Sequence, residues 1–274
     1  MNARSKMKLI TLGYSTVQSN FDRVYRSIKI LKQLLVEANI DKFVDILVIV
    51  QFSNDEKSYE ENGIRFVFTS KSGLSKSRNQ VVMLCESEYF WILDDDVFPT
   101  ASNVQKVLKY LVTRSFDIYI GQISCSDRDA DYKNYTKSRT GKLGLLRVSS
   151  IEVIVKIDFV LDKKIIFNEQ LGLGSRNPTG EENCFLLDAY HAGAKFKFIN
   201  ENIISHPCSN ELRIVRGQNN LSRIMIAKGY IARKIGGISG FLLMLYWQMK
   251  FFAHYKRLTV LISIFKGYFF RGML

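Results

Sequence analysis

Residues 89–97 read Tyr-Phe-Trp-Ile-Leu-Asp-Asp-Asp-Val, an aromatic and aliphatic run that ends abruptly in three carboxylates. Such a run is typical of a buried strand. In an α/β fold the carboxyl end of that strand emerges at the edge of the sheet, where ligands bind. Because side chains alternate along a strand, Asp94 and Asp96 are expected on one face and Asp95 on the other. Carboxylates that project together repel each other unless a cation or a donor-rich ligand lies between them.

Predicted strands and helices alternate around this segment. Strands are predicted at residues 8–14, 45–50, 64–68, 117–123, 151–157 and 196–204, with a short candidate strand at 164–167. Helices are predicted after Asn20, Gly73, Pro99 and Gly180, and the first places Val24, Ile28, Leu31 and Leu35 on one face. This alternation predicts an α/β unit with a mainly parallel sheet. We expect three segments to meet at one rim of the sheet: the turn Thr11–Ser15, the loop Gln51–Asn54 and the aspartates.

The composition indicates a folded globular protein, since 47% of the residues are hydrophobic and only three are prolines. Residues 1–8 are polar and basic and lack the apolar segment of a signal peptide, which favours a cytoplasmic protein. The four cysteines are Cys85, Cys125, Cys184 and Cys208. Since they show no CxxC spacing, we expect reduced thiols rather than a disulfide framework or a zinc cluster.

The positive charge is concentrated at the C-terminal end. Residues 212–274 hold eleven of the 39 Lys and Arg residues and none of the 26 Asp and Glu residues. They also contain apolar runs at 235–249 and 258–265, which are short for a membrane span. Aromatic and basic residues alternate between and after these runs, which predicts amphipathic helices that lie on an anionic membrane surface. The same charge could bind nucleic acid, but the many large aliphatic residues favour lipid. The alternative is a packed tail with a solvated basic face.

Four segments occur in an order that resembles bacterial family 2 glycosyltransferases with a GT-A fold. They are Gly73–Asn79 (GLSKSRN), Ile92–Asp96 (ILDDD), Gly180–Glu182 (GEE) and His206. The aspartates resemble the DxD motif of that family and GEE resembles its GED-type motif. The resemblance covers roughly the first 200 of the 274 residues.

The resemblance implies a divalent cation held by oxygen ligands, Mn²⁺ or Mg²⁺. Asp96 and, less directly, Asp94 are its expected ligands, and His206 is a third candidate. In the family pattern the first or middle aspartate instead contacts the ribose or the sugar, so the roles of Asp94 and Asp95 stay open. The alternative for His206 is a histidine that hydrogen-bonds locally at a turn.

The segment at Gly73 opens a helix, and a helix N-terminus favours anions. The predicted donor-binding residues are Thr11, Tyr14, Gln51, Ser75, Arg78, Asn79, Asp94 and Asp95. Arg78 adds a possible bidentate phosphate donor. The alternative is an ordinary helix start with a surface arginine.

Glu182 is the expected general base for the acceptor hydroxyl, with Glu181 as its orienting partner or substitute. The family usually carries Asp at the second acidic position, so Glu182 adds one methylene of reach. The alternative is a pair of acids that stabilise the first turn of a helix.

We therefore predict a GT-A catalytic domain at residues 1–211, with a nucleotide-sugar-binding half (1–115) and an acceptor-binding half (116–211). Residues 212–274 would be an amphipathic helical region for membrane association. The resemblance implies an inverting, hexosyltransferase-type enzyme of surface polysaccharide biosynthesis. A nucleoside-diphosphate sugar, most simply a UDP-sugar, would be its donor, and a glycan or polyprenyl-diphosphate-linked saccharide its acceptor. It would lie on the inner face of the cell membrane and bind no nucleic acid. The alternatives are a sugar-nucleotide nucleotidyltransferase and a non-catalytic membrane adaptor on the same scaffold.

Overall fold

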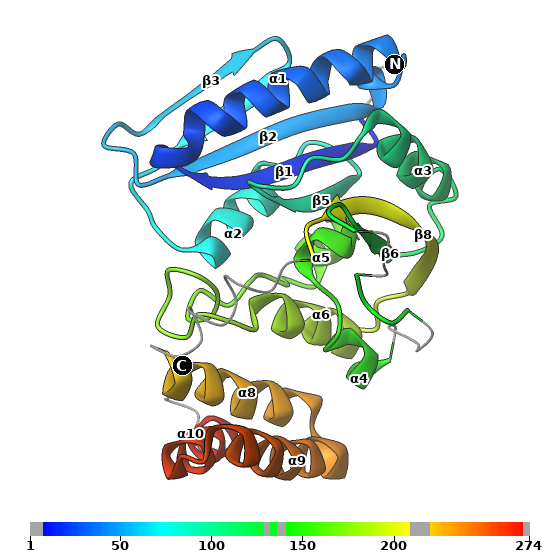
Figure 1. The fold of residues 1–274 in the computed structure, drawn as a ribbon. Helices are drawn as coiled ribbons and strands as arrows, with labels where there is room; N and C mark the ends of the chain where they lie inside the picture. Colours follow the sequence, from blue (N-terminus) through cyan, green and yellow to red (C-terminus); the bar gives the residue numbers. More distant parts are fainter. Residues whose placement is uncertain (1–7, 129–131, 136–140, 209–219, 271–274) are drawn as a thin grey trace. The chain divides into compact units, whose positions relative to one another are not determined.

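Figure 1 shows the computed structural model of the chain, which describes residues 8–128, 132–135, 141–208 and 220–270. These residues form two compact units. The first, called the sheet unit, consists of the described residues of Met1–Ser72, Lys76–Ile166 and Ala189–Cys208. The second, called the tail unit, consists of those of Gly73–Ser75, Phe167–Asp188 and Ser209–Leu274. The predicted functional boundary at residue 211 stays a prediction, because compactness does not define function.

The sheet unit contains one eight-stranded sheet in the order β3-β4-β2-β1-β5-β7-β6-β8. The strands are β1 (Ile10–Val17), β2 (Val44–Gln51), β3 (Lys57–Glu61), β4 (Ile64–Phe68), β5 (Tyr89–Asp94), β6 (Ile118–Cys125), β7 (Val153–Lys156) and β8 (Phe196–His206). Strands β4, β2, β1 and β5 are parallel, and β8 is parallel to β6. Among the described strands, β3 and β7 are the two that run antiparallel to the strands beside them. The predicted mainly parallel sheet is therefore confirmed.

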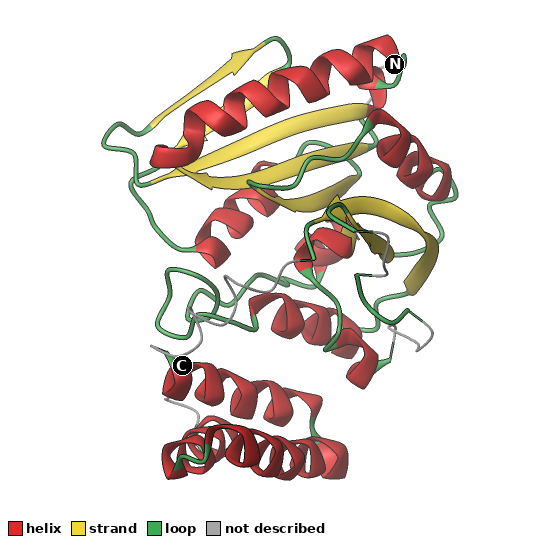
Figure 2. Ribbon diagram, viewed as in Figure 1, coloured by secondary structure: helices red, strands yellow, loops and turns green. Residues whose placement is uncertain are grey.

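Helices cover both faces of this sheet (Figure 2). The described helices of the sheet unit are η1 (Gln18–Asn20), α1 (Phe21–Glu37), η2 (Asp41–Phe43), α3 (Ala101–Leu111), α4 (Lys142–Leu145), η3 (Ser150–Glu152) and α5 (Ile157–Asp162). Two further helices, α2 (Leu74–Leu84) and α6 (Glu181–His191), have residues in both units. The buried residues of α1 and α3 join Leu12 and Trp91 in one core. On the other face a Cβ at Gly13 would collide with Val81, so α2 packs tightly against β1.

The sequence predicted most strands and helices, and the differences have local causes. The helix α1 buries Val24, Ile28, Leu31 and Leu35, as its periodicity predicts. Residues 164–167 are not a strand, because α5 precedes them and the chain leaves the helix in a turn at Lys164 (φ 52°). The strand β3 went unpredicted because its five residues are polar and mostly exposed.

The tail unit ends in three helices, α8 (Leu221–Ile235), α9 (Gly237–Tyr255) and α10 (Leu258–Phe269), which pack against one another (Figure 1). Glycines allow their backbones to approach closely. A Cβ at Gly229 of α8 would collide with the carbonyl oxygen of Ile264, and one at Gly267 of α10 with that of Ile226. None of the helices in the described parts of the chain is long and apolar enough to cross a membrane.

We expect Gly229→Ala to destabilise the protein, although Ala normally stabilises a helix by about 1 kcal/mol relative to Gly. The new methyl group meets backbone of α10 and not a flexible side chain, so the helices must separate. Overpacking of this kind costs about 1–3 kcal/mol. Urea unfolding measures the change. Gly141→Ala is the control, because nothing lies within 4 Å of a Cβ at Gly141 and its φ is −86°; equal stabilities of the two variants would contradict the packing.

Candidate active site

The aspartate segment lies at the rim of the sheet, where β5 ends at Asp94. Parallel register places Asp94 beside Ser15 of β1, and Val17 of β1 beside Gln51 of β2. The side chain of Asp94 accepts a hydrogen bond from Nη2 of Arg78 at 2.9 Å. Because the Arg78 side chain is only 2% exposed, this ion pair fixes the direction of Asp94. Arg78 thus contacts a carboxylate of its own chain, and its expected contact to phosphate stays a prediction.

Asp95 points to the opposite face, as strand alternation predicts. Its Oδ2 accepts hydrogen bonds from Oγ1 of Thr16 at 2.8 Å and from Nδ2 of Asn20 at 3.0 Å. Arg23 lies 3.6 Å from its Oδ1. Three donors therefore hold Asp95. Thr16 was missed in the sequence because β1 was predicted to end at Tyr14, whereas it continues through Thr16 to Val17.

Asp96 differs from its two neighbours. It is exposed and, among the described residues, forms no ion pair. Partial desolvation and the charges of Asp94 and Asp95 raise its pKa, and His206 opposes this shift. The described surroundings of Asp96 thus disfavour its negative charge on balance.

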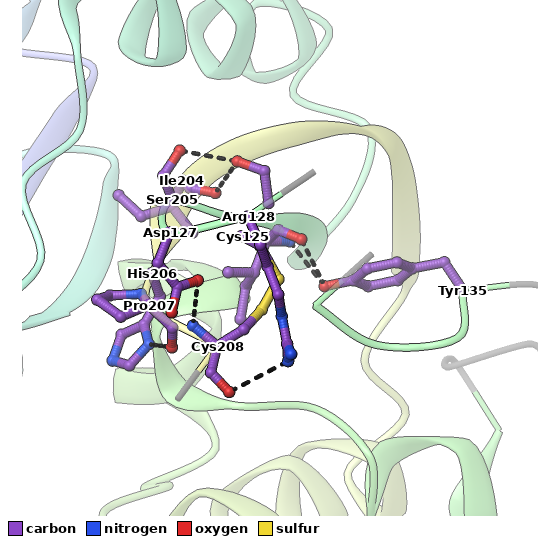
Figure 3. The surroundings of a disulfide bond; sticks show 11 residues. Cys125, Asp127, Arg128, Tyr135, Ile204, Ser205, His206, Pro207 and Cys208 are labelled. Atoms are coloured by element: carbon purple, nitrogen blue, oxygen red, sulfur yellow. Dashed lines mark hydrogen bonds between the residues drawn. A yellow bond between two sulfur atoms is a disulfide. The ribbon is translucent and has the colours of Figure 1, made fainter. Parts of the chain in front are cut away.

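His206, the last residue of β8, lies close enough to influence the charge of Asp96. Figure 3 shows its Nδ1 directed at the backbone oxygen of Pro207, 2.7 Å away. A carbonyl oxygen only accepts, so Nδ1 carries a proton, and in the neutral tautomer that this contact selects the lone pair lies on Nε2. A histidine held in this way is suited to bind a metal through Nε2. The ring also contacts Tyr132 edge-on, with centroids 5.5 Å apart.

These residues are of the types that bind hard divalent cations, although among the described residues the side chains of Asp94, Asp96 and His206 do not form a group whose ligand atoms all lie within 4.8 Å of one another. Asp96 supplies a carboxylate without an ion pair, Asp94 a second carboxylate in a fixed direction, and His206 a nitrogen with a defined tautomer. Hard divalent cations prefer such oxygen-rich sites, and imidazole is tolerated by Mn²⁺.

Two predicted donor-binding residues lie away from the rim. Thr11 is fully buried within β1, and its Oγ1 contacts Asp45 at 3.3 Å and Ser87 at 2.9 Å. Tyr14 is also fully buried and stacks on Phe98, and burial raises its pKa. The prediction that these two residues form a rim turn is wrong, because β1 extends three residues further than its apolar pattern indicates. Thr16 occupies the position expected of Thr11.

Gln51 and Asn79 are both buried, and Gln51 lies at the end of β2 at the expected rim. The start of α2 belongs to the tail unit and contacts the glycine-containing loop of that unit. The N–H of Leu74 donates to the carbonyl oxygen of Leu173 at 2.8 Å, and Oγ of Ser75 donates to that of Leu171 at 2.6 Å. The expectation that this helix start offers unpaired N–H groups to an anion therefore fails for Leu74.

Glu181 and Glu182 are the first residues of α6 and follow Gly180, which has a φ of 90°. Glu181 is buried, and a Cβ at Gly172 (φ 93°) would lie 3.1 Å from its Cδ. The loop that contains Gly172 therefore runs directly over this carboxylate, within the tail unit. Glu182 is partly exposed.

Lys228 of α8 is a charged neighbour of Glu182 that was not predicted from the sequence. Burial lowers the pKa of Lys228, and the charge of Glu182 opposes this shift. A signal was present in the sequence: Leu221, Met225, Lys228, Ala232 and Ile235 share one helix face, so the lysine interrupts an otherwise apolar stripe. A second contact in the same unit joins Lys234 to Asp188 at 2.5 Å.

The cysteines differ from expectation in one respect. Cys125 and Cys208 form a disulfide, whereas Cys85 and Cys184 are free. Cys125 ends β6 and Cys208 follows β8, so parallel pairing of these strands brings their Cα atoms to 5.5 Å. A separation of 83 residues hides this proximity in the sequence.

Part of the sequence also matches a known protein family. Residues 22–167, which contain the strands β2 to β7 and the three aspartates, match the model of the family described as "Glycosyl transferase family 2". The chain belongs to glycosyl transferase family 2. Its enzymes transfer sugars, so this chain is a glycosyltransferase.

Solved structures with the same fold support the GT-A architecture of this family 2 member. TarS of S. aureus (residues 1–349) matches with a TM-score of 0.60 and 11% identity, over 95% of this chain and 90% of that one. The TarS complex with UDP-GlcNAc matches with a TM-score of 0.59 and 11% identity, over 96% and 90%. Glucosyl-3-phosphoglycerate synthase of Mycobacterium tuberculosis, in complex with Mn²⁺, UDP and glucosyl-3-phosphoglycerate, matches with a TM-score of 0.52 and 14% identity, over 80% of each chain. Comparison with curated proteins gave no match.

Proposed function

We propose that this family 2 enzyme is an inverting, metal-dependent glycosyltransferase that uses a nucleoside-diphosphate sugar, most simply a UDP-sugar. The observation that carries the proposal is the aspartate segment at the sheet rim. Two of its carboxylates are held by groups of the same chain, and Asp96 has no ion-pair partner among the described residues. The similar structures that contain UDP, UDP-GlcNAc or Mn²⁺ support the same donor and cofactor class.

Asp96, Asp94 and His206 are the proposed holders of Mn²⁺ or Mg²⁺. When bound, the cation would neutralise the charge that develops on the diphosphate leaving group. The Arg78 ion pair keeps Asp94 in one direction, which lowers the entropy lost when a ligand binds. Asp95 is already oriented by Thr16 and Asn20 and is the proposed contact to the ribose or the sugar.

Glu182 is the proposed general base. It would accept the proton of the acceptor hydroxyl while the oxygen forms its bond to the anomeric carbon and the nucleoside diphosphate leaves. A single displacement inverts the anomeric centre and needs no covalent enzyme intermediate. Lys228 lies close enough to Glu182 for the carboxylate charge to oppose the burial-induced lowering of the Lys228 pKa. Glu181, which is buried under the loop at Gly172, is the proposed positioning partner.

A panel of nucleoside-diphosphate sugars tests the donor proposal. We expect one uridine nucleotide sugar to raise the melting temperature in the presence of Mn²⁺ and not in the presence of EDTA, and to be hydrolysed slowly without an acceptor. Stabilisation by no nucleotide, or by a nucleotide equally well without a divalent cation, would overturn it.

We also propose that the tail unit holds the enzyme on an anionic membrane, at the inner face of the cell membrane, and that the acceptor is a lipid-linked saccharide or glycan of surface polysaccharide synthesis. The support is an apolar stripe on the side of α9 opposite to its buried residues. Its members, exposed by 38–79%, are Ile238, Phe241, Leu242, Leu245, Tyr246, Met249 and Phe252. A similar stripe on α10 consists of Leu258, Ile262, Phe265 and Phe269.

Lysines flank both stripes, and no acidic residue occurs from residue 212 onward. Lys250 and Lys266 are exposed beside the stripes, and Lys256 and Arg257 join the two helices. The helices already pack against each other on their opposite sides, so these stripes are not needed for the packing of α8, α9 and α10. An apolar stripe with a basic border matches the interface of an anionic bilayer.

The variant Ile238→Glu/Met249→Glu is expected to lose vesicle binding. Each side chain, 79% and 73% exposed, would contribute about 1.5–3 kcal/mol on burial, so the partition coefficient should fall at least about 100-fold. Flotation with vesicles of phosphatidylglycerol and phosphatidylcholine measures it. The matched control is Ile30→Glu/Met83→Glu, which changes an Ile and a Met exposed by 62% and 70% in the sheet unit. Equal binding of both variants, or equal binding to purely zwitterionic vesicles, would contradict the membrane proposal.

A further inference from the structure

Two cysteines and an aspartate meet where β6 and β8 end, and the proposed sugar transfer uses none of them. Cys125 is the last residue of β6, and Cys208 lies two residues beyond β8. Among the described residues, they and Asp127 form a group of metal-ligand side chains whose ligand atoms all lie within 4.8 Å of one another. Figure 3 shows the disulfide and Asp127 side by side.

Backbone contacts fix this group in place. Oδ1 of Asp127 accepts a hydrogen bond from the N–H of Cys208 at 2.9 Å, so the carboxylate is held against that cysteine. Nη2 of Arg128 donates to the carbonyl oxygen of Cys208 at 3.4 Å. The N–H of Ser126 donates to the carbonyl oxygen of His206 at 3.2 Å. The segment after β6 is thus fastened to the segment after β8 whether or not the sulfurs are bonded.

We infer that Cys125, Cys208 and Asp127 form a redox-gated site for Zn²⁺ or a similar thiophilic divalent cation. Two thiolates and one carboxylate are a ligand set typical of zinc, with a fourth position for water. At Zn–S distances of about 2.3 Å, tetrahedral geometry places the sulfurs about 3.8 Å apart. The disulfide excludes this arrangement. After reduction, Cα atoms 5.5 Å apart allow it by side-chain rotation alone.

The opening step is an exchange with a dithiol. Cys125 is partly exposed whereas Cys208 is buried, so the first thiolate of the reductant attacks Sγ of Cys125, and Cys208 leaves as a thiolate. The second thiol of the reductant then attacks the mixed disulfide and releases Cys125. Two electrons pass to the cysteine pair, the reductant becomes a disulfide, and its two protons end on the two thiols. Binding of the cation releases these two protons to water.

The sulfur ligands separate this site from the proposed donor site. Thiolates select soft or borderline cations, whereas Asp94 and Asp96 suit Mg²⁺ and Mn²⁺. The free cysteines do not provide an alternative site. Burial raises the pKa of both Cys85 and Cys184, and neither has a second ligand group with it among the described residues.

Titration of the full chain with Co²⁺, in the absence of nucleotide, tests the inference. The protein is reduced with a phosphine, desalted under argon and titrated with Co²⁺. We expect one equivalent to produce the thiolate-to-cobalt charge-transfer absorption in the near ultraviolet, and Zn²⁺ but not excess Mg²⁺ to remove it. The oxidised protein should give none. Cys85→Ser should keep the band, Cys125→Ser and Cys208→Ser should lose it, and Asp127→Asn should weaken the affinity at least tenfold.

A second measurement needs no variant. In the reduced wild-type chain, Zn²⁺ should slow alkylation of Cys125 and Cys208 by iodoacetamide at least tenfold and leave Cys85 unchanged, as read by peptide mass spectrometry. A reduced chain that shows no cobalt band, or no protection of the two cysteines, overturns the inference. Because Asp96→Asn should leave the band intact, loss of the proposed donor function and loss of this site are distinguishable.

Discussion

Replacement of Asp96 by Asn is expected to lower the rate of sugar transfer about 1,000-fold or more. The cation is proposed to contribute several kcal/mol to stabilisation of the diphosphate leaving group, and each 1.36 kcal/mol corresponds to a factor of ten. Asp96 is the carboxylate of the segment without an ion pair among the described residues, so its removal leaves no local substitute. The rate is measured as release of nucleoside diphosphate, with and without acceptor.

Asp162→Asn is the matched control, because Asp162 is an exposed aspartate at the end of α5 in the same compact unit. The control should retain the wild-type rate. The rate of Asp94→Asn should lie between those of Asp96→Asn and the control, since Arg78 would keep the new amide in a similar place. If Asp96→Asn and the control had the same rate with every donor tested, Asp96 would not hold the cation.

Replacement of Glu182 by Gln is expected to lower kcat about 100- to 10,000-fold, the usual contribution of a general base. The amide keeps the size and polarity of the side chain but does not accept the proton. Affinity for the nucleotide should stay within about threefold, because the proposed contacts to the donor lie on other residues. Single-turnover transfer and calorimetry with the nucleoside diphosphate separate these two effects.

Glu181→Gln discriminates between the two glutamates. If Glu181 is a positioning residue, Glu181→Gln should lower kcat by a smaller factor than Glu182→Gln does. Glu181→Asp should have a higher kcat than Glu181→Gln, because it keeps the charge under the loop at Gly172. A larger loss in Glu181→Gln than in Glu182→Gln would reverse the two roles.

The fold was largely predictable because its signals are local. Alternating apolar strands and amphipathic helices define a mainly parallel sheet, and Val24, Ile28, Leu31 and Leu35 lie on the buried face of α1 as their spacing requires. Alternation also correctly separated Asp94, which contacts Arg78, from Asp95, which contacts Thr16. The end of β1 was missed because Ser15-Thr16 is polar and resembles a turn, although both residues are buried.

The details of the candidate site were less predictable because they depend on distant parts of the chain. The ion pair of the buried Arg78 with Asp94 was not predicted, because the two residues are 16 positions apart on different elements. The disulfide joins residues that are 83 positions apart, and only the pairing of β6 with β8 brings them together. Lys228 was detectable as a charge on an apolar helix face, but its proximity to Glu182 was not. Residue type and spacing thus indicate the chemistry of a site, whereas the fold determines which distant side chains contact each other.

The central claim is that the aspartate segment binds a nucleoside diphosphate together with a divalent cation. Isothermal titration of UDP into the full chain, with Mn²⁺ and then with EDTA, tests it most directly. We predict one site per chain with Mn²⁺, at least tenfold weaker binding in EDTA, and at least tenfold weaker binding of Asp96→Asn in Mn²⁺. Binding of UDP that is equally tight in EDTA, or equally tight in Asp96→Asn, would contradict the claim.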